Sequence, residues 1–402
     1  MSLTKFHIMA KPASFKCNLK CDYCFYLEKE SFIQETNEHF LMSNINLRNY
    51  IKSYIRGCDL DVIDFAWQGG EPTLAGLEFF ERAVEYQKKY ANGKKITNSF
   101  QTNAISINNK WAKFFHDNNF LLGVSIDGLS DVHDRYRISV NGNPTFERVK
   151  NSIELLIEHK VEFNTLTVVN DKNWQRGKET YQALKSMGVK HMQFIPIVEV
   201  DQNRTGCSTA NQIIKDVSEM ASFSVPPHGF GVFLSDVFDQ WVRADIGEIY
   251  VQTFESILST WIGHGATICH HLNECGTSLV LEHDGDLYSC DHYVYPSHKL
   301  GNIHDTSIGK LASGKKQSQF GKAKNKKISD DCRQCEYYSL CNSGCPKHRI
   351  FKSNNGKYKD NYLCESYKLL FSKTSPAMKM MVNQIQSGGA PQNIMVLYAM
   401  SN

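Results

Sequence analysis

Three cysteines stand close together near the start of the 402-residue chain, at Cys17, Cys21 and Cys24. Their Cys-x3-Cys-x2-Cys spacing can place three thiolates on one short loop. A cubic iron–sulfur cluster normally takes four thiolates, so this loop would leave one iron open to a small molecule. The alternatives are three unrelated buried thiols or part of a zinc knuckle, because a free cysteine often behaves as a small core residue. The spacing and the Tyr-Cys-Phe-Tyr context together favour the cluster.

A second group of eight cysteines occupies the last third of the chain: Cys269, Cys275, Cys290, Cys332, Cys335, Cys341, Cys345 and Cys364. Eight thiolates are the ligand count of two four-cysteine sites. Such sites hold zinc as readily as an iron–sulfur cluster, so the spacing alone leaves both open. The odd total of 13 cysteines and the lack of an apolar signal segment favour metal ligation over disulfides. Cys58 and Cys207 remain, and we interpret them as ordinary thiols.

The composition is that of a soluble globular protein, with 41% hydrophobic and 22% charged residues. The length allows two or three domains that each bury a core. A net charge of +3 is too balanced to indicate nucleic acid or an anionic membrane as the main partner. No stretch approaches the ~20 apolar residues that span a bilayer. We therefore expect a cytoplasmic protein with no nucleic-acid and no membrane partner.

Short apolar runs alternate with amphipathic stretches over residues 6–200, which predicts six strand–helix units. The expected strands are Phe6–Lys11, Val62–Trp67, Thr97–Thr102, Leu121–Ile126, Phe163–Val169 and His191–Ile197. The expected helices are Leu47–Ile55, Leu77–Tyr90, Lys110–Asn118, Phe146–His159 and Gln175–Met187. Such repetition implies a parallel sheet with right-handed crossovers. It does not separate an open sheet from a barrel, but in both the ligands bind at the carboxyl ends of the strands.

Chemically informative residues follow several of these strands. After the second strand, the paired glycines of Gly69-Gly70-Glu71 permit close backbone approach and could present amides and carbonyls to an amino acid. Taken alone, this sequence is also a common structural turn. After the fourth strand, the hydroxyl of Ser125 can donate a hydrogen bond, and the guanidinium of Arg137 suits a carboxylate. The alternative for Arg137 is a solvated surface charge.

The segment after the sixth strand is apolar around Val198, which could pack on an adenine ring or belong to the core. Residues 200–260 then contain a break at 225–229 and two amphipathic stretches, Phe230–Val242 and Ile249–Trp261, that read as helices. We interpret this part as a bridge to the second cysteine group. It could also line a substrate groove.

The three-cysteine loop and the Gly-Gly-Glu turn resemble motifs of the radical S-adenosylmethionine (SAM) superfamily. Nearly the whole chain is similar to the anaerobic sulfatase-maturating enzymes. The resemblance covers Trp67–Thr73, Gln101–Asn103, Gly123–Gly128, Met192–Glu199, Tyr288–His292, Leu300–Ile303, the run from Cys332 to Cys345, and the tail at 390–395. Related enzymes usually have Gly after the equivalent of Asn103, so Ala104 departs from the pattern and makes the local backbone conformation uncertain.

The resemblance implies an α/β fold, a partial (β/α)6 radical SAM barrel with a C-terminal Cys-rich SPASM domain. The expected domains are the barrel at 1–230, a helical bridge at 231–268, the SPASM domain at 269–370 and a C-terminal helix and tail at 371–402. It also implies that the free iron on the three-cysteine loop holds the amino and carboxyl groups of SAM. The implied SAM contacts are Tyr23, Gly69, Gly70, Glu71, Ser125, Arg137 and Val198.

Two auxiliary [4Fe–4S] clusters are implied in addition, which makes three clusters in all. The first would be bound by Cys269, Cys275, Cys290 and Cys345, and the second by Cys332, Cys335, Cys341 and Cys364. With all eight positions filled by thiolates, neither auxiliary cluster has a free iron for substrate. Electron transfer is therefore their expected role.

Asp291, directly after Cys290, is implied to be the catalytic base. A carboxylate can act as a general base if it reaches the substrate proton, although many Asp residues in such loops only cap turns. The implied reaction oxidises a Cys or Ser of a sulfatase polypeptide to Cα-formylglycine. A 5′-deoxyadenosyl radical removes a Cβ hydrogen, Asp291 takes a proton, and an electron leaves through the auxiliary clusters. A low-potential electron donor such as flavodoxin or ferredoxin is expected.

Two other functions remain open from the sequence. A SPASM peptide maturase would form a thioether, a carbon–carbon crosslink or an epimer in a ribosomal peptide. Such enzymes often carry an N-terminal peptide-binding module, and only sixteen residues precede Cys17 here. A non-catalytic iron–sulfur or zinc-binding protein would leave Gly69–Glu71 and Ser125 without a role.

Overall fold

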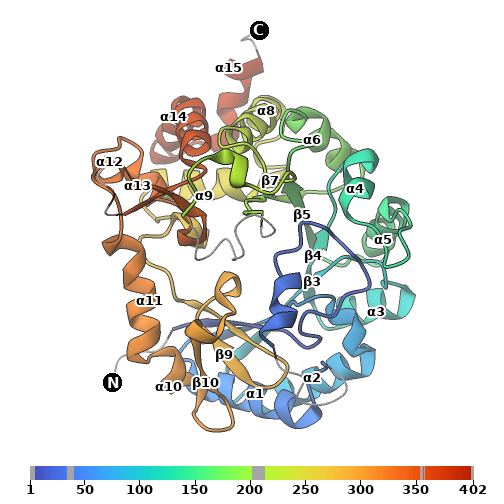
Figure 1. Cartoon of the computed structure of the whole chain (residues 1–402). Coiled ribbons are helices and arrows are strands. Elements are labelled where there is room, and N and C mark those ends of the chain that lie inside the picture. Colours follow the sequence, from blue (N-terminus) through green and yellow to red (C-terminus); the bar gives the residue numbers. More distant parts are fainter. Residues whose placement is uncertain (1–4, 34–39, 202–212, 354–355, 357, 400–402) are drawn as a thin grey trace. The chain divides into compact units, whose positions relative to one another are not determined.

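The computed structural model describes residues 5–33, 40–201, 213–353, 356 and 358–399. Cys58 is a buried free cysteine, whereas Cys207 lies outside the described residues. The chain divides into two compact units, and Figure 1 labels helices and strands of both. The first comprises Met1–Ser125, Asp134–Phe163 and Cys275–Ala323, and the second comprises Ile126–His133, Asn164–Glu274 and Lys324–Asn402. Each unit takes residues from both halves of the sequence, and the expected domain boundaries stay a prediction.

The strands of the first unit follow the order β10-β9-β8-β1-β2-β3-β4. They are β1 (His7–Ala10), β2 (Val62–Trp67), β3 (Lys95–Thr102), β4 (Phe120–Ser125), β8 (Ser278–Leu281), β9 (Asp286–Tyr288) and β10 (Lys299–Asn302). Strands β1 to β4 pair in parallel, and β8 joins the other side of β1 in parallel. Strands β9 and β10 continue from β8 by antiparallel pairing. Strand β1 is thus paired on both edges, and its residues Ile8 and Ala10 are fully buried.

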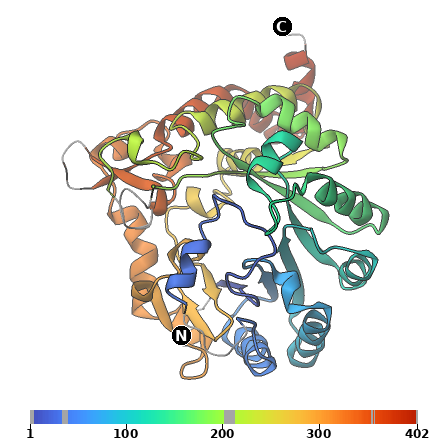
Figure 2. The same ribbon diagram turned by 45° about the vertical axis from the view of Figure 1, so that its right-hand side comes forward.

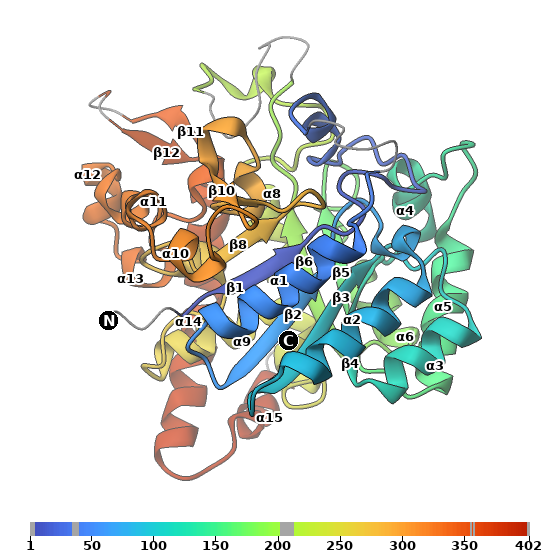
Figure 3. The ribbon, with the colours of Figure 1, turned by 90° about the horizontal axis from the view of Figure 1, so that it is seen from below.

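The helices of the first unit are α1 (Asn44–Gly57), α2 (Leu77–Tyr90), α3 (Asn109–Asp117), α5 (Phe146–Glu158) and α10 (Ile308–Ala312), while α4 (Ser130–Tyr136) and α11 (Lys315–Lys326) contain residues of both units. Figure 3 shows α1 and α2 side by side. Helix α1 begins after Ser43, whose hydroxyl accepts the Asn46 N–H and so caps the first turn. Its apolar face packs on β2, with Tyr54 and Phe65 in edge contact at 5.2 Å between ring centres.

In the second unit, β5 (Phe163–Val169), β6 (His191–Pro196) and β7 (Tyr250–Val251) pair in parallel, and β11 (Arg349–Lys352) pairs antiparallel with β12 (Lys359–Asn361). Its helices are α6 (Gly177–Ser186), α8 (Gly229–Ala244), α9 (Gln252–Trp261), α12 (Asp330–Arg333), α13 (Tyr338–Cys341), α14 (Cys364–Gln386) and α15 (Met395–Ala399). Figures 1 and 2 show α8 beside α14. A Cβ atom on Gly231 would lie 2.5 Å from the Ser366 carbonyl oxygen, so glycine permits this close helix crossing.

The predicted strand–helix units are confirmed, and β2, β5 and α2 have the predicted bounds. The prediction of a helix over Ile249–Trp261 is wrong in its first three residues. Tyr250 and Val251 form β7 instead, where Tyr250 pairs with His191 and its N–H donates to the Lys190 carbonyl at 2.7 Å. Aromatic and β-branched residues suit a strand, and the open edge of β6 offers the pairing partner. Among the described residues, no helix is both long and apolar enough to cross a membrane.

Candidate active site

The predicted cysteine loop and the predicted glycine turn lie directly against each other in the first unit. The Gly70 N–H donates to the Ser14 carbonyl at 2.7 Å, and the Glu71 N–H donates to the Lys16 carbonyl at 2.8 Å. A Cβ atom on Gly70 would lie only 2.0 Å from that Lys16 oxygen, and Gly69 has a φ of +153°. Only glycine tolerates such an approach, so the turn needs its glycines to dock beside the cysteines.

Glu71 ties this turn to the carboxyl end of β3. Its Oε1 accepts hydrogen bonds from the Thr73 N–H (3.1 Å), the Thr73 hydroxyl (2.7 Å) and the Thr102 hydroxyl (2.9 Å), and its Oε2 accepts the Asn103 N–H (2.8 Å). Burial raises the pKa of the Glu71 carboxyl, while these donors act in the opposite direction. The carboxylate therefore holds two strand ends together.

Asn103 reaches from β3 to the cysteine loop. Its side-chain amide donates to Asn18 Oδ1 at 2.7 Å and to Cys17 Sγ at 3.6 Å, and the Leu19 N–H also donates to that sulfur at 3.4 Å. Burial raises the pKa of the Cys17 thiol to about 11, and both donors oppose this effect. Because the metal ligand is a thiolate, these donors favour the form that a cluster needs.

Ala104, which departs from the usual glycine, adopts a φ of 61° in the left-handed region. The Ala104 N–H donates to the Thr102 hydroxyl at 2.9 Å, and the Ser152 hydroxyl donates to the Ala104 carbonyl at 2.8 Å. These contacts hold an alanine in a conformation that glycine adopts without strain. The turn that presents Asn103 is therefore formed despite the substitution.

Arg137 also reaches the cysteine loop. The Lys20 N–H donates to the Ile138 carbonyl at 2.9 Å, which joins the loop to the segment after α4. The Arg137 guanidinium lies 5.5 Å from the centre of the Tyr23 ring, and the side chain is only 7% exposed. The solvated-charge alternative is therefore wrong. Burial raises the pKa of the Cys24 thiol, and the positive charge of Arg137 counteracts it.

The two remaining predicted SAM contacts, Ser125 and Val198, come from other segments of the chain. Ser125 ends β4, and its hydroxyl accepts a hydrogen bond from the Gln101 side-chain amide at 3.0 Å. It therefore lies at the same strand edge as the end of β3, within the first unit. Val198 belongs to the second unit, where it is buried. Its contact with adenine stays a prediction.

Asp291, the predicted base, lies at the start of a short 3-10 turn, Asp291–Tyr293. Its Oδ1 is 2.7 Å from the Nζ of Lys11, which follows β1 and is 1% exposed. The same Nζ donates to Gln68 Oε1 at 3.2 Å and lies 4.4 Å from the centre of the Tyr26 ring. The sequence did not single out Lys11, Gln68 or Tyr26. The available signal was position, because Lys11 and Gln68 directly follow the carboxyl ends of β1 and β2.

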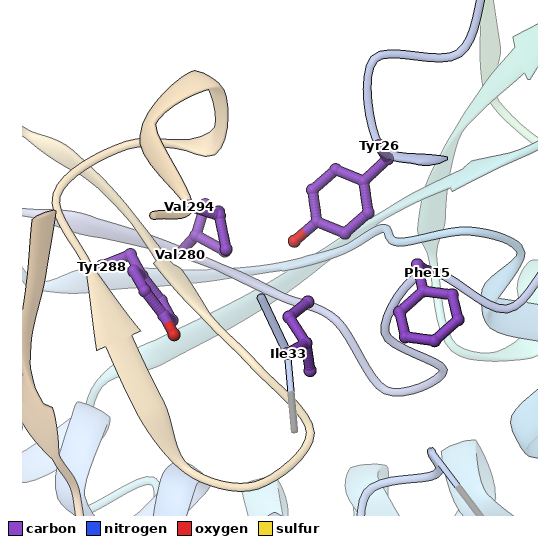
Figure 4. Packing of buried hydrophobic residues seen from close by; sticks show 6 residues of the cluster. All are labelled: Phe15, Tyr26, Ile33, Val280, Tyr288 and Val294. Carbon is purple, nitrogen blue, oxygen red and sulfur yellow. The ribbon is translucent and has the colours of Figure 1, made fainter. Parts of the chain in front are cut away.

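Tyr26 connects the polar residues around Lys11 to an apolar cluster. Figure 4 shows Tyr26 and Phe15 on one side of the cluster, with Val280, Tyr288 and Val294 on the other. The Tyr26 hydroxyl donates to the buried carboxylate of Glu282. Burial raises the pKa of Tyr26 well above its ordinary value, and the negative charges of Glu282 and Asp291 add to the effect. Tyr26 is therefore a neutral hydrogen-bond donor.

Cys275 and Cys290 lie in the first unit, and one side chain connects their loops. The side-chain amide of Gln317 on α11 donates to the Gly276 carbonyl at 2.9 Å and to the Ser289 carbonyl at 3.1 Å. The Cys275 N–H donates to the Gly321 carbonyl at 3.2 Å. Helix α11 thus holds the residue after one predicted ligand and the residue before the other.

Four predicted ligands line one cavity of the second unit, which has a volume of about 450 Å³. Its walls contain Cys332, Cys335, Cys341 and Cys364 together with the aromatic residues Tyr337, Tyr338, Phe351, Tyr362, Tyr367 and Phe371. Burial raises the pKa of Cys341 to about 12, and the neighbouring Cys364 and Cys332 add to it. All four thiols line this one cavity, which fits the grouping implied for the second auxiliary cluster, although no group of three or more His, Cys, Asp or Glu side chains among the described residues is placed to hold a single metal ion.

Cys269 and Cys345 are neighbours elsewhere in the second unit. Burial raises the pKa of the Cys269 thiol, and the negative charge of a Cys345 thiolate raises it further. The buried Lys324 donates to the carbonyls of Cys269 at 3.3 Å and His270 at 2.9 Å. The other two members of the implied first auxiliary set, Cys275 and Cys290, belong to the first unit. That complete ligand set stays a prediction.

Comparison with known protein families finds matches to two segments of the chain. A model of the radical SAM superfamily matches residues 12–184, and a model of the SPASM iron–sulfur cluster-binding domain matches residues 269–336. A serine-type anaerobic sulfatase-maturating enzyme of Bacteroides thetaiotaomicron is 38% identical over 97% of this chain and 94% of its own length. A cysteine-type anaerobic sulfatase-maturating enzyme of Clostridium perfringens (strain 13 / Type A) is 34% identical over 94% of this chain and 99% of its own.

Solved structures agree with these matches. Native anSMEcpe with bound AdoMet and Cp18Cys peptide superposes with a TM-score of 0.82 at 33% identity, covering 94% of this chain and 99% of that one. Streptococcus suis SuiB bound to precursor peptide SuiA superposes with a TM-score of 0.61 at 12% identity, covering 90% and 76%, which shows similarity of fold alone. The predicted fold class, a radical SAM α/β fold followed by a SPASM domain, is confirmed.

Proposed function

Because the chain belongs to the family of anaerobic sulfatase-maturating enzymes, we propose that it oxidises a Cys or Ser side chain of a sulfatase polypeptide to Cα-formylglycine. The observation that carries this proposal is the similarity over nearly the full length to both serine-type and cysteine-type relatives. The chain is a radical SAM enzyme whose cofactors are SAM and iron–sulfur clusters. Its substrate is a polypeptide.

The cysteines divide among three proposed [4Fe–4S] clusters. Cys17, Cys21 and Cys24 would hold the first, which when bound supplies the electron that splits SAM into methionine and a 5′-deoxyadenosyl radical. The two groups of four described above would hold the auxiliary clusters. The convergence of Cys332, Cys335, Cys341 and Cys364 on one cavity supports the second of these groups.

Most of the proposed SAM contacts belong to the first unit and lie at or beside the three-cysteine loop. Tyr23 and Arg137 present an aromatic face and a guanidinium there, and Arg137 suits the carboxylate of SAM. Gly69 and Gly70 expose backbone at the same place, where a side chain would collide. Glu71 contributes by holding this turn, because its carboxylate is engaged by four hydrogen bonds within the protein. Ser125 and Val198 complete the proposed set.

Asp291 is the proposed base. The oxidation removes one hydrogen atom from the substrate Cβ, one proton from its thiol or hydroxyl, and one further electron. A Ser substrate gives the aldehyde directly, whereas a Cys substrate gives a thioaldehyde that water hydrolyses to the aldehyde with release of hydrogen sulfide. Asp291 takes the proton on a carboxylate oxygen, and its 19% exposure leaves it open to a bound peptide. The auxiliary clusters, when bound, would supply an acceptor for that electron. The remaining proposed features are a donor such as flavodoxin or ferredoxin, a cytoplasmic location, and the absence of a nucleic-acid partner.

The reaction itself provides the test of this function. The reconstituted enzyme, expected to carry about twelve irons in three clusters, would be incubated with SAM, dithionite and matched sulfatase-motif peptides that differ only in Cys or Ser at the target position. We expect 5′-deoxyadenosine together with a peptide aldehyde from at least one peptide. Deoxyadenosine with both peptides unchanged would contradict the sulfatase assignment and favour the SPASM peptide-maturase alternative. A zinc protein with little iron would contradict the radical mechanism altogether.

The variant Asp291→Asn tests the base. It should lower aldehyde formation by about 10²- to 10⁴-fold, because the substrate proton loses its acceptor, while the iron content stays unchanged. Asp286→Asn is a matched control, since Asp286 is likewise ion-paired with a lysine, Lys299, but lies in β9. Equal turnover of Asp291→Asn and the unaltered enzyme would remove Asp291 from this role.

A further inference from the structure

Lys11 is a buried cation to which the proposed mechanism assigns no role. An ammonium group stays charged in a protein interior only where neighbours compensate it. Lys11 Nζ has three such neighbours: Asp291 Oδ1 at 2.7 Å, Gln68 Oε1 at 3.2 Å, and the face of Tyr26 at 4.4 Å. One ion pair, one amide and one aromatic face therefore compensate the charge of Lys11, which in addition opposes the rise that burial causes in the pKa of the Cys24 thiol.

The two residues of the ion pair, Lys11 and Asp291, lie in different kinds of backbone structure. Lys11 directly follows the central strand β1, and its N–H donates to the Leu281 carbonyl of β8 at 2.8 Å. On the other side of β1, the Gln68 N–H donates to the Ala10 carbonyl at 3.0 Å. Asp291 instead starts a three-residue 3-10 turn after β9. The position of Lys11 is therefore set by the sheet, and a side chain on a sheet can fix one on a turn.

We propose that Lys11 is a positioning residue for the reaction. It holds Oδ1 of Asp291 and so leaves Oδ2 as the atom that accepts the substrate proton. In that step the bond from the substrate sulfur or oxygen to its hydrogen breaks, an Oδ2–H bond forms, and Lys11 keeps its own protons. The inference rests on the proposed function, specifically on Asp291 as the base.

The chain offers a matched control in Lys29. Its side chain is also 1% exposed, its Nζ is 2.7 Å from Glu28 Oε1, and it lies 3.5 Å from the centre of the Tyr295 ring. Lys29 therefore reproduces the burial, the ion pair and the aromatic face in the same unit. Its ion pair is with Glu28 rather than with Asp291, so its loss reports the structural cost of removing such a lysine.

The test is a double-mutant cycle with the full-length reconstituted enzyme: Lys11→Met, Asp291→Asn, the two combined, and Lys29→Met. Iron content, 5′-deoxyadenosine and peptide aldehyde are measured for each. We expect Lys11→Met to keep its iron and its deoxyadenosine, but to lower the aldehyde formed per deoxyadenosine about tenfold or more. The combined variant should be no worse than Asp291→Asn alone, because Lys11 acts through Asp291. Lys29→Met should leave the ratio unchanged.

A further variant keeps the test decisive if Lys11→Met fails to fold. Lys11→Arg retains the charge with a different donor geometry, and we expect a ratio below that of the unaltered enzyme but above that of any uncharged variant that folds. Effects of Lys11 and Asp291 that multiply, or an equal loss in Lys29→Met, would overturn the positioning role alone. Full activity of Asp291→Asn would overturn the base assignment and this inference together.

Discussion

The two cysteine sites that the structure brings together within single units differ in their surroundings. Around the three-cysteine loop the neighbours are polar: Cys17 Sγ receives the Leu19 N–H and the Asn103 amide, and Arg137 lies beside Tyr23. The four-cysteine cavity is lined by six aromatic residues and by six polar or charged ones, Asp331, Ser343, Asp360, Asn361, Glu365 and Lys368. Hydrogen bonds to sulfur and solvent access both tune an iron–sulfur cluster. We expect the loop, with an amide and a guanidinium beside its thiols, to bind the small-molecule cofactor. We expect the cavity, which gathers its four thiols among aromatic and polar side chains, to serve electron transfer.

Removing one ligand from the loop should have the largest effect. In Cys24→Ala only two thiolates remain there, so we expect the loss of about four of about twelve irons. Deoxyadenosine formation should disappear with them, because no cluster is left to reduce SAM. Iron analysis and a deoxyadenosine assay check this result. Cys58→Ala is the control, since Cys58 is a buried thiol of the same unit outside both groups and should retain all the iron.

Removing one ligand from the cavity should give a different pattern. In Cys341→Ala we again expect the loss of about four irons. The three-cysteine loop is untouched, however, so deoxyadenosine should still form while the aldehyde falls, because the electron loses its exit. The ratio of aldehyde to deoxyadenosine is the measurement. Loss of deoxyadenosine in parallel with the aldehyde would contradict the division of roles between loop and cavity.

The sequence predicted the elements that position the site better than it predicted the site's internal contacts. The regular spacing of apolar residues predicted the bounds of β2, β5 and α2 correctly, because strands and helices of that length show a clear periodicity. Strand β9 has three residues, and β8 and β10 have four each, which is too short for a period to register clearly. The C-terminal half of the first unit's sheet was therefore not foreseen.

The contacts of Lys11 escaped prediction for a different reason. Lys11 and Asp291 are 280 positions apart in the numbering, and neither neighbourhood contains a pattern that refers to the other. Their ion pair exists because β8 pairs in parallel with β1, with Val280 opposite Met9, and β9 pairs antiparallel with β8, with Tyr288 opposite Val280. The turn after β9 is thereby brought alongside β1. Tertiary pairing of this kind has no local signature. The cysteines, in contrast, were recognisable because their spacing itself encodes ligation.

The smallest expected effect comes from removing a single side-chain amide, that of Asn103, beside the three-cysteine loop. In Asn103→Ala the Cys17 sulfur and Asn18 each lose a donor, so SAM cleavage should slow several-fold and stability should fall by about 1 kcal/mol per hydrogen bond. Initial rates of deoxyadenosine formation and thermal unfolding measure the two effects.

Asn342 provides the matched comparison, because its amide donates to the His271 carbonyl at 2.8 Å in the second unit. Its φ of 46° suits glycine, so Asn342→Gly removes the hydrogen bond without adding backbone strain. We expect a loss of stability of about 1 kcal/mol and an unchanged rate of SAM cleavage. Equal slowing in both variants would show that the amide of Asn103 acts through overall stability. Slowing in Asn103→Ala alone would assign its effect to the contacts with Cys17 and Asn18.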